Sequence, residues 1–368
     1  MTVAIVRAIG RALDGTDLSR AEMAEAIGQI MDGQATAAQI AGLLIALRAK
    51  GEAVDELVGA ASAMRSRATP LACPRIEHSI DTCGTGGDGA GTFNVSTLAA
   101  ILIAACGGVV AKHGNRALTS KCGSADILEA LGVVIDAEPA NVTRCIRIAG
   151  IGFAFAPRFH AATRHAAGPR RELGTRTIFN LLGPLTNPAN VRHQVVGVYD
   201  RRWCEPMAAA LGALGLRRAA VVHGHDGLDE ISVRGETHVA IYDAGELTSM
   251  TLSPRSFGCR EVDPEGLAGG DATHNAAVLR RVLAGHVGHH EAIVNAAAMT
   301  AALGLELLEP GALDLDRLPD QFIRAHTVAV DGAARLALYR WCEASQADLG
   351  ADLSALTTKT AADFQGVE

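Results

Sequence analysis

Hydrophobic residues in the first part of the chain repeat with the spacing of an α-helix. Ile40, Leu43, Leu44 and Leu47 fall on one helix face in this way. We therefore expect residues 1–73 to form a small all-helical domain. Its spare apolar surface leaves two interpretations open, a buried core or a dimer interface.

Local signals mark where two of these helices begin. Ser19 is followed three residues later by Glu22, and Thr36 by Gln39. In each pair the hydroxyl and the longer side chain can satisfy free backbone amides at a helix start, which is the capping-box arrangement. Both pairs therefore predict helix N-termini.

Beyond about residue 74, short apolar segments alternate with helical ones. We expect strands at residues 76–82, 109–112, 195–198, 219–223 and 239–242, and helices at 98–105 and 125–131. Such alternation predicts a mostly parallel sheet with helices on both faces. The expected fold class is α/β, with a small all-helical N-terminal domain plus a larger domain whose mostly parallel central sheet is flanked by helices.

Breaks in the pattern set the expected domain limits. The α/β domain should comprise residues 74–160 and 191–345. Residues 161–190 are rich in Arg, His and Gly, and this excursion should pack back on the helical domain. Residues 346–368 are polar and Ala-rich and should form a C-terminal extension.

Composition and charge argue against several functional classes. The net charge of −7 and the aromatic content of 4% disfavour a nucleic-acid partner, which needs a basic surface or stacking rings. The eight cysteines include no C-x-x-C pair, a pattern typical of a reduced protein without structural zinc or disulfides. The first residues lack the apolar core of a signal peptide, and no uncharged apolar stretch approaches membrane-spanning length. We expect a cytoplasmic protein with no membrane partner.

A glycine-rich loop follows the first expected strand. Gly84, Gly86 and Gly87 permit the positive φ values that turn successive backbone N–H groups toward one anion. Ser96 and Thr97 stand at the following helix start, where hydroxyls, free amides and the helix dipole favour a phosphate. The loop is therefore predicted to bind a phosphate group.

The same loop matches G-x-G-x-x-G at residues 84–89, the dinucleotide fingerprint. That fingerprint also needs an acidic residue at the end of the next strand, and here that strand ends in Lys112 and His113. A nicotinamide dinucleotide is therefore disfavoured. Asp88 has two open roles, accepting hydrogen bonds from a sugar hydroxyl or organising the loop amides.

A second candidate anion loop follows the second expected strand. Lys112 and Arg116 bring positive charge to this loop. Its small, hydroxyl and neutral donor residues are His113, Gly114, Asn115, Thr119, Ser120, Gly123 and Ser124. These residue types suit a terminal phosphate at the start of the next helix. Both loops lie beyond strand carboxyl ends, where parallel sheets bind ligands, so they predict a ligand with phosphate at both ends.

Several segments, in order along nearly the whole chain, resemble the signatures of the anthranilate phosphoribosyltransferase family. They are Gly-Thr-Gly-Gly-Asp at 84–88, Asn-Val-Ser-Thr at 94–97, Lys-His-Gly-Asn-Arg at 112–116, Gly-Ser-Ala-Asp-Ile-Leu-Glu-Ala-Leu-Gly at 123–132, Phe-Ala-Pro-Arg-Phe-His at 155–160, Arg-Arg-Glu-Leu-Gly at 170–174, Arg-Thr-Ile-Phe-Asn-Leu-Leu-Gly-Pro-Leu-Thr-Asn-Pro at 176–188 and His-Asp-Gly-Leu-Asp-Glu-Ile at 225–231. The resemblance implies transfer of the 5-phosphoribosyl group from 5-phosphoribosyl-1-pyrophosphate to the amine of anthranilate. The products would be N-(5-phosphoribosyl)anthranilate and pyrophosphate, in tryptophan biosynthesis. It also implies a homodimer formed through the helical domain.

The resemblance further implies which residues bind each part of the substrates. The pyrophosphate should contact Gly84, Gly87, Asp88, Thr92, Asn94, Val95, Ser96 and Thr97. The ribose and its 5′-phosphate should contact Lys112, His113, Gly114, Asn115, Arg116, Thr119, Ser120 and Ser124. Anthranilate should lie near Gly84, Asn115 and Arg170, with His113 and His160 lining its entry. Two Mg²⁺ ions per subunit are implied, one at Ser96 and Glu230 and one at Asp229 and Glu230.

The residue chemistry agrees with these implied roles. Asp229 and Glu230 offer adjacent hard oxygen ligands for a magnesium ion that stabilises the charge on leaving pyrophosphate, although a solvated acidic turn is the alternative interpretation. Arg170 can pair with the anthranilate carboxylate and fix the amine toward the sugar carbon. The aryl amine is neutral and already nucleophilic, so no residue is assigned as a general base.

Two other functions stay open from the sequence. A pyrimidine nucleoside phosphorylase shares the fold that the resemblance implies, and it would cleave thymidine or uridine with phosphate. A non-catalytic relative that binds nucleic acid is the second alternative. The negative net charge and the presence of the expected donor and metal residues argue against the latter.

Overall fold

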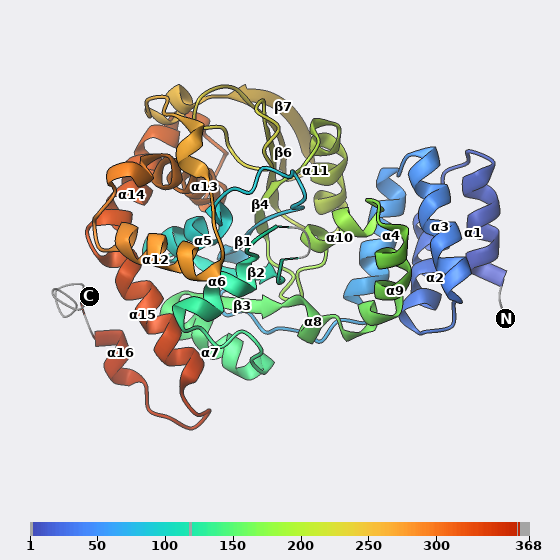
Figure 1. Ribbon diagram of the computed structural model, residues 1–368, viewed down its shortest axis with the longest axis horizontal. Helices are drawn as coiled ribbons and strands as arrows, with labels where there is room; N and C mark the ends of the chain where they lie inside the picture. Colours follow the sequence, from blue (N-terminus) through green and yellow to red (C-terminus); the bar gives the residue numbers. More distant parts are fainter. Residues whose placement is uncertain (1–2, 118–119, 359, 361–368) are drawn as a thin grey trace.

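The computed structural model describes residues 3–117, 120–358 and 360. The N-terminal domain is a bundle of helices at one end of the molecule, beside the larger sheet-containing domain (Figure 1). Its helices are α1 (Val3–Leu13), α2 (Arg20–Met31), α3 (Ala37–Lys50) and α4 (Val54–Arg65). The predicted all-helical N-terminal domain is confirmed.

Both predicted capping boxes form. The Ser19 hydroxyl accepts from the Glu22 N–H at 3.3 Å, and the Glu22 carboxylate accepts from the Ser19 N–H at 2.9 Å. Thr36 and Gln39 make the same reciprocal pair at 3.2 and 2.9 Å. Each box satisfies amides that a helix start otherwise leaves free, so α2 and α3 begin where predicted.

A seven-stranded sheet with the order β3-β2-β1-β4-β5-β6-β7 forms the centre of the larger domain. The strands are β1 (Ser79–Gly84), β2 (Val109–Gly114), β3 (Ile151–Phe155), β4 (His193–Gly197), β5 (Arg218–Gly224), β6 (Thr237–Asp243) and β7 (Glu246–Leu252). The five strands β3, β2, β1, β4 and β5 run parallel, whereas β6 and β7 are antiparallel to their neighbours. The prediction of a mostly parallel sheet is confirmed.

Two details of the sheet differ from the sequence pattern. β1 begins at Ser79 because Ile76–His78 forms a 3₁₀ turn, so the expected strand at 76–82 starts too early. β7 has no counterpart among the expected strands, since most of its side chains are exposed and it lacks the alternation of a half-buried strand. It forms because Ala244 and Gly245, both at positive φ, turn the chain back on β6.

Helices cover both faces of the sheet (Figure 1). They are α5 (Val95–Ala105), α6 (Ser124–Leu131), α7 (Pro139–Ala149), α11 (Cys204–Ala213), α12 (Ala272–Leu283), α13 (Glu291–Leu308), α14 (Leu318–Val330) and α15 (Ala333–Gln346). Side chains of β2 alternate between the two faces: Val110 enters the core formed with α5 and α13, whereas Val109 and Ala111 enter the core formed with α7.

Helix α13 is the central core helix of the larger domain. By length and composition alone, the segment Gly288–Leu308 could cross a membrane, but 89% of its most apolar window is buried inside the protein. It packs against α5 and α14. Its apolar character is therefore explained by the core that it fills.

The excursion at 161–190 carries two helices toward the N-terminal bundle. α8 (Ala156–Phe159) precedes it, α9 (Arg164–Leu173) packs against α2 and α3, and α10 (Phe179–Leu185) packs against α4 and α11. Figure 1 shows α10 between the sheet and the bundle, and α9 among the helices of the bundle. This segment therefore joins the two domains, while the domain limits themselves stay a proposal.

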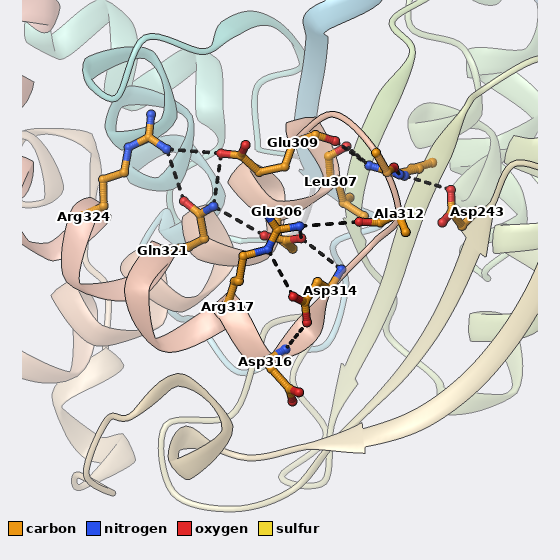
Figure 2. Close-up of polar contacts among 12 residues, drawn as sticks. Asp243, Glu306, Leu307, Glu309, Ala312, Asp314, Asp316, Arg317, Gln321 and Arg324 are labelled. Carbon is orange, nitrogen blue, oxygen red and sulfur yellow. Dashed lines mark hydrogen bonds and ion pairs between the residues drawn. The ribbon is translucent and has the colours of Figure 1, made fainter.

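A polar cluster lies at the edge of the sheet where β5 begins (Figure 2). Arg218 is 3% exposed, pairs with Asp243 at 2.8 Å, and donates to carbonyl groups within residues 307–311 at the end of α13. The fully buried Glu306 pairs with Arg317 at 3.2 Å. These contacts fix the end of α13 to the sheet and to the turn that precedes α14, at the edge opposite the carboxyl end of β5.

The first part of the C-terminal extension contacts α15. A short helix, α16 (Ser354–Thr358), follows it, and Arg340 of α15 donates to the carbonyl oxygens of Leu356 and Thr357 at 2.8 and 3.2 Å. Residues 361–368 lie outside the described part of the chain.

Candidate active site

Three loops with candidate chemistry meet at the carboxyl edge of the sheet. The first glycine loop follows Gly84 at the end of β1, the second follows Gly114 at the end of β2, and the acidic pair Asp229 and Glu230 follows β5. The parallel register places the ends of these strands at one edge. This is the edge where open α/β sheets bind ligands.

The first glycine loop packs directly on the acidic loop. Gly86, at φ +62°, donates its N–H to Asp229 Oδ2 at 2.8 Å. A Cβ at Gly84 would lie 2.7 Å from the same carboxylate oxygen, so a larger residue there would displace the Asp229 side chain. Gly87 also has a positive φ, +80°, as the sequence predicts for an anion-binding turn.

The acidic pair is not a solvated turn. Asp229 is only 9% exposed and Glu230 is half-buried. Burial, and then the neighbouring charge of Asp88, raise the pKa of Asp229 to about 7. Burial and the charge of Asp229 raise the pKa of Glu230 well above its ordinary value, although Lys112 opposes the shift. Neighbouring buried carboxylates with such raised pKa values are typical of a functional site.

Lys112 lies beneath the two loops and not in solvent. It is 1% exposed, and its ammonium donates to the Thr82 carbonyl oxygen at 2.5 Å and to Ser96 Oγ at 3.3 Å. Burial lowers the pKa of Lys112, while the charges of Asp81 and Glu230 oppose that shift. Its positive charge is therefore compensated by carboxylates around the start of α5.

The start of α5 presents hydroxyl and amide groups to the same place. The helix begins at Val95, three residues earlier than the expected helix at 98–105, so Ser96 and Thr97 lie in its first turn. Thr97 Oγ1 is buried and has no hydrogen-bond partner among the described residues. Asn94 donates to the Cys122 carbonyl oxygen at 3.1 Å, which ties the first loop to the second.

The rest of the first loop is held by its own contacts. Asp88 Oδ1 accepts from the Ala90 N–H at 3.1 Å, so this carboxylate does organise a loop amide. Its Oδ2 is buried without a partner among the described residues. Thr92 forms an isolated β-bridge with Ala268.

The second loop is closed by Asp126 of α6. Asp126 Oδ2 accepts from the Ala117 and Gly123 N–H groups at 2.9 and 2.8 Å. The Arg116 guanidinium turns onto α6, where it pairs with Asp126 at 3.0 Å and Glu129 at 2.8 Å. Its donors are therefore already engaged, although we expected Arg116 to contact the ribose or its phosphate.

The smaller residues of the second loop lie close together. Ser124 Oγ donates to the Asn115 carbonyl oxygen at 3.3 Å, and Asn115 Oδ1 accepts from the Arg116 N–H at 2.8 Å. A Cβ at Gly114 would lie 2.2 Å from Ser124 Oγ. Thr119 lies outside the described residues.

Two buried histidines form a pair behind the loops. The rings of His113 and His160 are 5.1 Å apart, and the side chains are 5% and 4% exposed. His113 Nδ1 lies 3.2 Å from the Gly183 carbonyl oxygen, and the Nε2 atoms of both rings have no partner among the described residues. Burial lowers the pKa of His113 to about 3 and that of His160 to about 4, so both rings are neutral near pH 7.

A cavity of about 890 Å³ opens between the first loop and α9. Four predicted site residues line it: Gly87, Asp88, Ser120 and Arg170. Arg170 is half-buried and lies 5.0 Å above the Phe179 ring, and burial lowers its pKa. Its guanidinium pairs with no carboxylate in the described part of the chain, so an acidic ligand can bind there.

Some residues that shape the site have no role in the sequence prediction. Asn187 donates to Asp81 Oδ2 and to the Ala111 carbonyl oxygen, both at 2.8 Å, and so fixes the strands beneath the histidines. Asn275 of α12 donates to Asn94 Oδ1 at 3.0 Å. Arg176 contacts the first loop. Arg176 and Asn187 belong to the conspicuous segment 176–188, but nothing in the sequence marks Asn275.

Comparisons with protein families match both domains. Residues 77–334 match the α/β domain of a glycosyl transferase family, and residues 6–68 match the helical bundle domain of such a family. The anthranilate phosphoribosyltransferase of Moorella thermoacetica is 52% identical over 298 residues, which are 80% of this chain and 88% of that protein.

Solved structures agree with the sequence comparisons. The crystal structure of anthranilate phosphoribosyltransferase from Thermus thermophilus has a TM-score of 0.85 and 42% identity, covering 92% of this chain and 99% of that one. The Saccharomyces cerevisiae enzyme in complex with phosphoribosyl pyrophosphate and Mg has a TM-score of 0.83 and 27% identity, covering 94% and 98%. Another structure of the yeast enzyme contains 4-fluoroanthranilate, with a TM-score of 0.81 and 26% identity, covering 94% and 98%.

Proposed function

This chain belongs to the anthranilate phosphoribosyltransferase family, and from that premise we infer its reaction. It transfers the 5-phosphoribosyl group of 5-phosphoribosyl-1-pyrophosphate to the amine of anthranilate, a step of tryptophan biosynthesis. The observation that carries this conclusion is the meeting of two glycine-rich loops and a buried acidic pair at one sheet edge. A sugar with phosphate at both ends needs such a double site.

The pyrophosphate end of the donor is proposed to bind the first loop and the start of α5. Free amides at the helix start and the positive end of its dipole favour an anion there. The residues with this role are Gly84, Gly87, Asp88, Thr92, Asn94, Val95, Ser96 and Thr97. The unpartnered Thr97 hydroxyl supports it, because a buried hydroxyl without a partner is costly unless a ligand pairs with it.

The 5′-phosphate and the ribose are proposed to bind the second loop at the start of α6. The residues with this role are Lys112, His113, Gly114, Asn115, Arg116, Thr119, Ser120 and Ser124. Arg116 would have to leave Glu129 to reach a phosphate. Because that pair is largely exposed, the exchange costs little.

The yeast enzyme binds Mg, and we propose that this chain uses Mg²⁺, with one ion at Ser96 and Glu230 and a second at Asp229 and Glu230. The donor set fits, because it is all oxygen, and the raised carboxylate pKa values show that burial without a cation disfavours the charged forms that a cation would stabilise. Two ions per subunit are our proposal. When bound, Mg²⁺ stabilises the charge that develops on departing pyrophosphate.

Anthranilate is proposed to bind on the α9 side of the cavity. Arg170 would hold its carboxylate and turn the amine toward the sugar carbon, with Gly84 and Asn115 nearby. His113 and His160 would line the entry as neutral rings, which avoids placing positive charge beside the amine. No general base is assigned, because the free aryl amine already carries the lone pair that attacks.

Assembly and location are also proposals. A homodimer through the N-terminal helices would cover exposed apolar side chains of that domain, including Val6, Leu13 and Ile45. A cytoplasmic location suits a chain whose cysteines are free in the described residues. We propose neither a nucleic acid nor a membrane as partner, in line with the net charge of −7.

The test is an assay of anthranilate fluorescence with the full-length protein, Mg²⁺ and phosphoribosyl pyrophosphate. We expect the fluorescence to fall, and to stay constant when either the donor or the protein is omitted. Constant fluorescence with folded protein would reject the function. Arsenate-dependent cleavage of thymidine in the same preparation would instead indicate a nucleoside phosphorylase.

A further inference from the structure

Arg176 connects the segment between α9 and α10 to the first glycine loop. Its guanidinium donates to the Gly87 carbonyl oxygen and lies 4.1 Å from the centre of the Tyr199 ring. Both Arg176 and Gly87 line the 890 Å³ cavity. The side chain is therefore held on two sides, by a backbone carbonyl and by an aromatic face.

This contact fixes the orientation of one peptide group. The Gly87 carbonyl and the Asp88 N–H belong to the same peptide unit, and the described chain contains no cis peptide bond. In a trans peptide the C=O and the N–H point in opposite directions. When Arg176 holds the carbonyl, the Asp88 N–H therefore points away from Arg176.

The Asp88 N–H has no hydrogen-bond acceptor among the residues that the structure describes. The neighbouring Gly86 N–H, by contrast, is already engaged by Asp229 at 2.8 Å. Gly87 has no Cβ and therefore tolerates a wide range of φ and ψ, so the peptide that follows it can turn when nothing holds it. The Asp88 amide is thus free, and its direction depends on a side chain from another segment.

We propose that Arg176 is a positioning residue, which holds the Gly87–Asp88 peptide so that the Asp88 amide is presented to the pyrophosphate of the donor substrate. This role rests on the proposed function. In this role Arg176 acts through the Gly87 carbonyl, to which its Nη2 donates, and not through a direct contact with phosphate.

The two roles make different demands on Tyr199. A positioned guanidinium needs the ring beneath it, whereas a direct charge contact needs only the charge. Tyr199→Leu removes the ring and keeps Arg176, while Tyr199→Phe keeps the ring and serves as the matched control. Because Tyr199 is largely buried, the melting temperature of each variant is measured alongside its kinetics.

The experiment measures the KM for phosphoribosyl pyrophosphate, the KM for anthranilate, kcat, and the Kd for magnesium pyrophosphate. Arg176→Met should raise the donor KM and the pyrophosphate Kd by about tenfold, the loss expected for one hydrogen bond to a charged group. The anthranilate KM and the melting temperature should change little. Arg176→Lys should restore part of the loss, and Tyr199→Leu should reproduce part of it. A crystal structure of Arg176→Met should show the Gly87 carbonyl turned away from residue 176.

Three results would overturn the proposal. They are unchanged donor and pyrophosphate binding in Arg176→Met, an unmoved Gly87–Asp88 peptide in that variant, or a Tyr199→Leu variant that folds and binds pyrophosphate like the wild type. Failure of the proposed function would look different, because the wild-type protein itself would then neither bind magnesium pyrophosphate nor consume anthranilate.

Discussion

Substituting Gly197 by Ala should disable the site through the backbone of the acidic loop. Gly197 ends β4 and pairs with Gly84 of β1. A Cβ at this position would lie 1.6 Å from the Asp229 carbonyl oxygen and 2.6 Å from the Asp229 carbonyl carbon. Since both atoms are backbone, no rotamer change can remove the clash.

The size of the effect follows from this distance. The Asp229 carbonyl oxygen must retreat beyond 3.0 Å, so the loop that carries Asp229 and Glu230 moves by about 1.5 Å. A misplacement of about 1 Å in a catalytic group can cost about 10²-fold in rate. We therefore expect kcat/KM to fall about 10²-fold, or about 2.7 kcal/mol in transition-state stabilisation. Overpacking should also lower the stability of the fold, by about 1–3 kcal/mol.

The assay is anthranilate fluorescence at several Mg²⁺ concentrations, with thermal melting of the same samples. Gly10→Ala is the matched control, because a Cβ there meets nothing within 4 Å and the residue lies in α1, far along the chain from the site. It should leave kcat/KM unchanged. If Gly197→Ala kept wild-type kcat/KM and Mg²⁺ dependence, the close packing of the acidic loop on β4 would be irrelevant to catalysis.

Four further predictions address single side chains. Arg170→Ala should raise the KM for anthranilate with a loss of about 1.5–3 kcal/mol, because a charged hydrogen bond disappears; unchanged acceptor kinetics would contradict its role. Asp229→Asn should raise the Mg²⁺ concentration for half-maximal activity, and wild-type metal dependence would remove it from the ligand set. His160→Gln should reduce the loss of folding stability on acidification. The folded pKa of His160, about 4, lies below the unfolded value of about 6.5, so this histidine lowers the free energy of unfolding by about 1.4 kcal/mol for each pH unit as the pH falls between the two values. Denaturant titrations at several pH values measure this slope. Arg218→Ala should destabilise the fold by about 3–5 kcal/mol, because Asp243 and several buried carbonyl groups lose their hydrogen-bond donor. A melting temperature near that of the wild type would contradict this value.

The elements that could be predicted are those determined by residues close together in the sequence. The capping boxes at Ser19 and Thr36 involve residues three apart, so the starts of α2 and α3 were predictable. The parallel strands contain buried apolar runs, which also mark them clearly. β7 could not be predicted from its own residues, because it is stabilised by pairing with β6 and not by burial of an apolar face.

The site was predictable as a set of loops but not as a set of contacts. Glycine, hydroxyl and basic residues marked the two loops that the fold brings to one sheet edge, and the end of β2 marked Lys112. The sequence could not show that Lys112 is buried under α5, or that Arg116 turns onto Glu129, because those positions depend on neighbours set by the tertiary fold. The same holds for Asn275, whose partner Asn94 is 181 residues away in the chain.

The most direct test of the whole account follows both products of one reaction. Protein, Mg²⁺, phosphoribosyl pyrophosphate and anthranilate are combined, and pyrophosphate release and N-(5-phosphoribosyl)anthranilate formation are measured together. We predict that the two appear one for one and that neither forms without anthranilate or Mg²⁺. Pyrophosphate released without the ribosylated amine, or no release by folded protein, would contradict the transfer reaction assigned to this site.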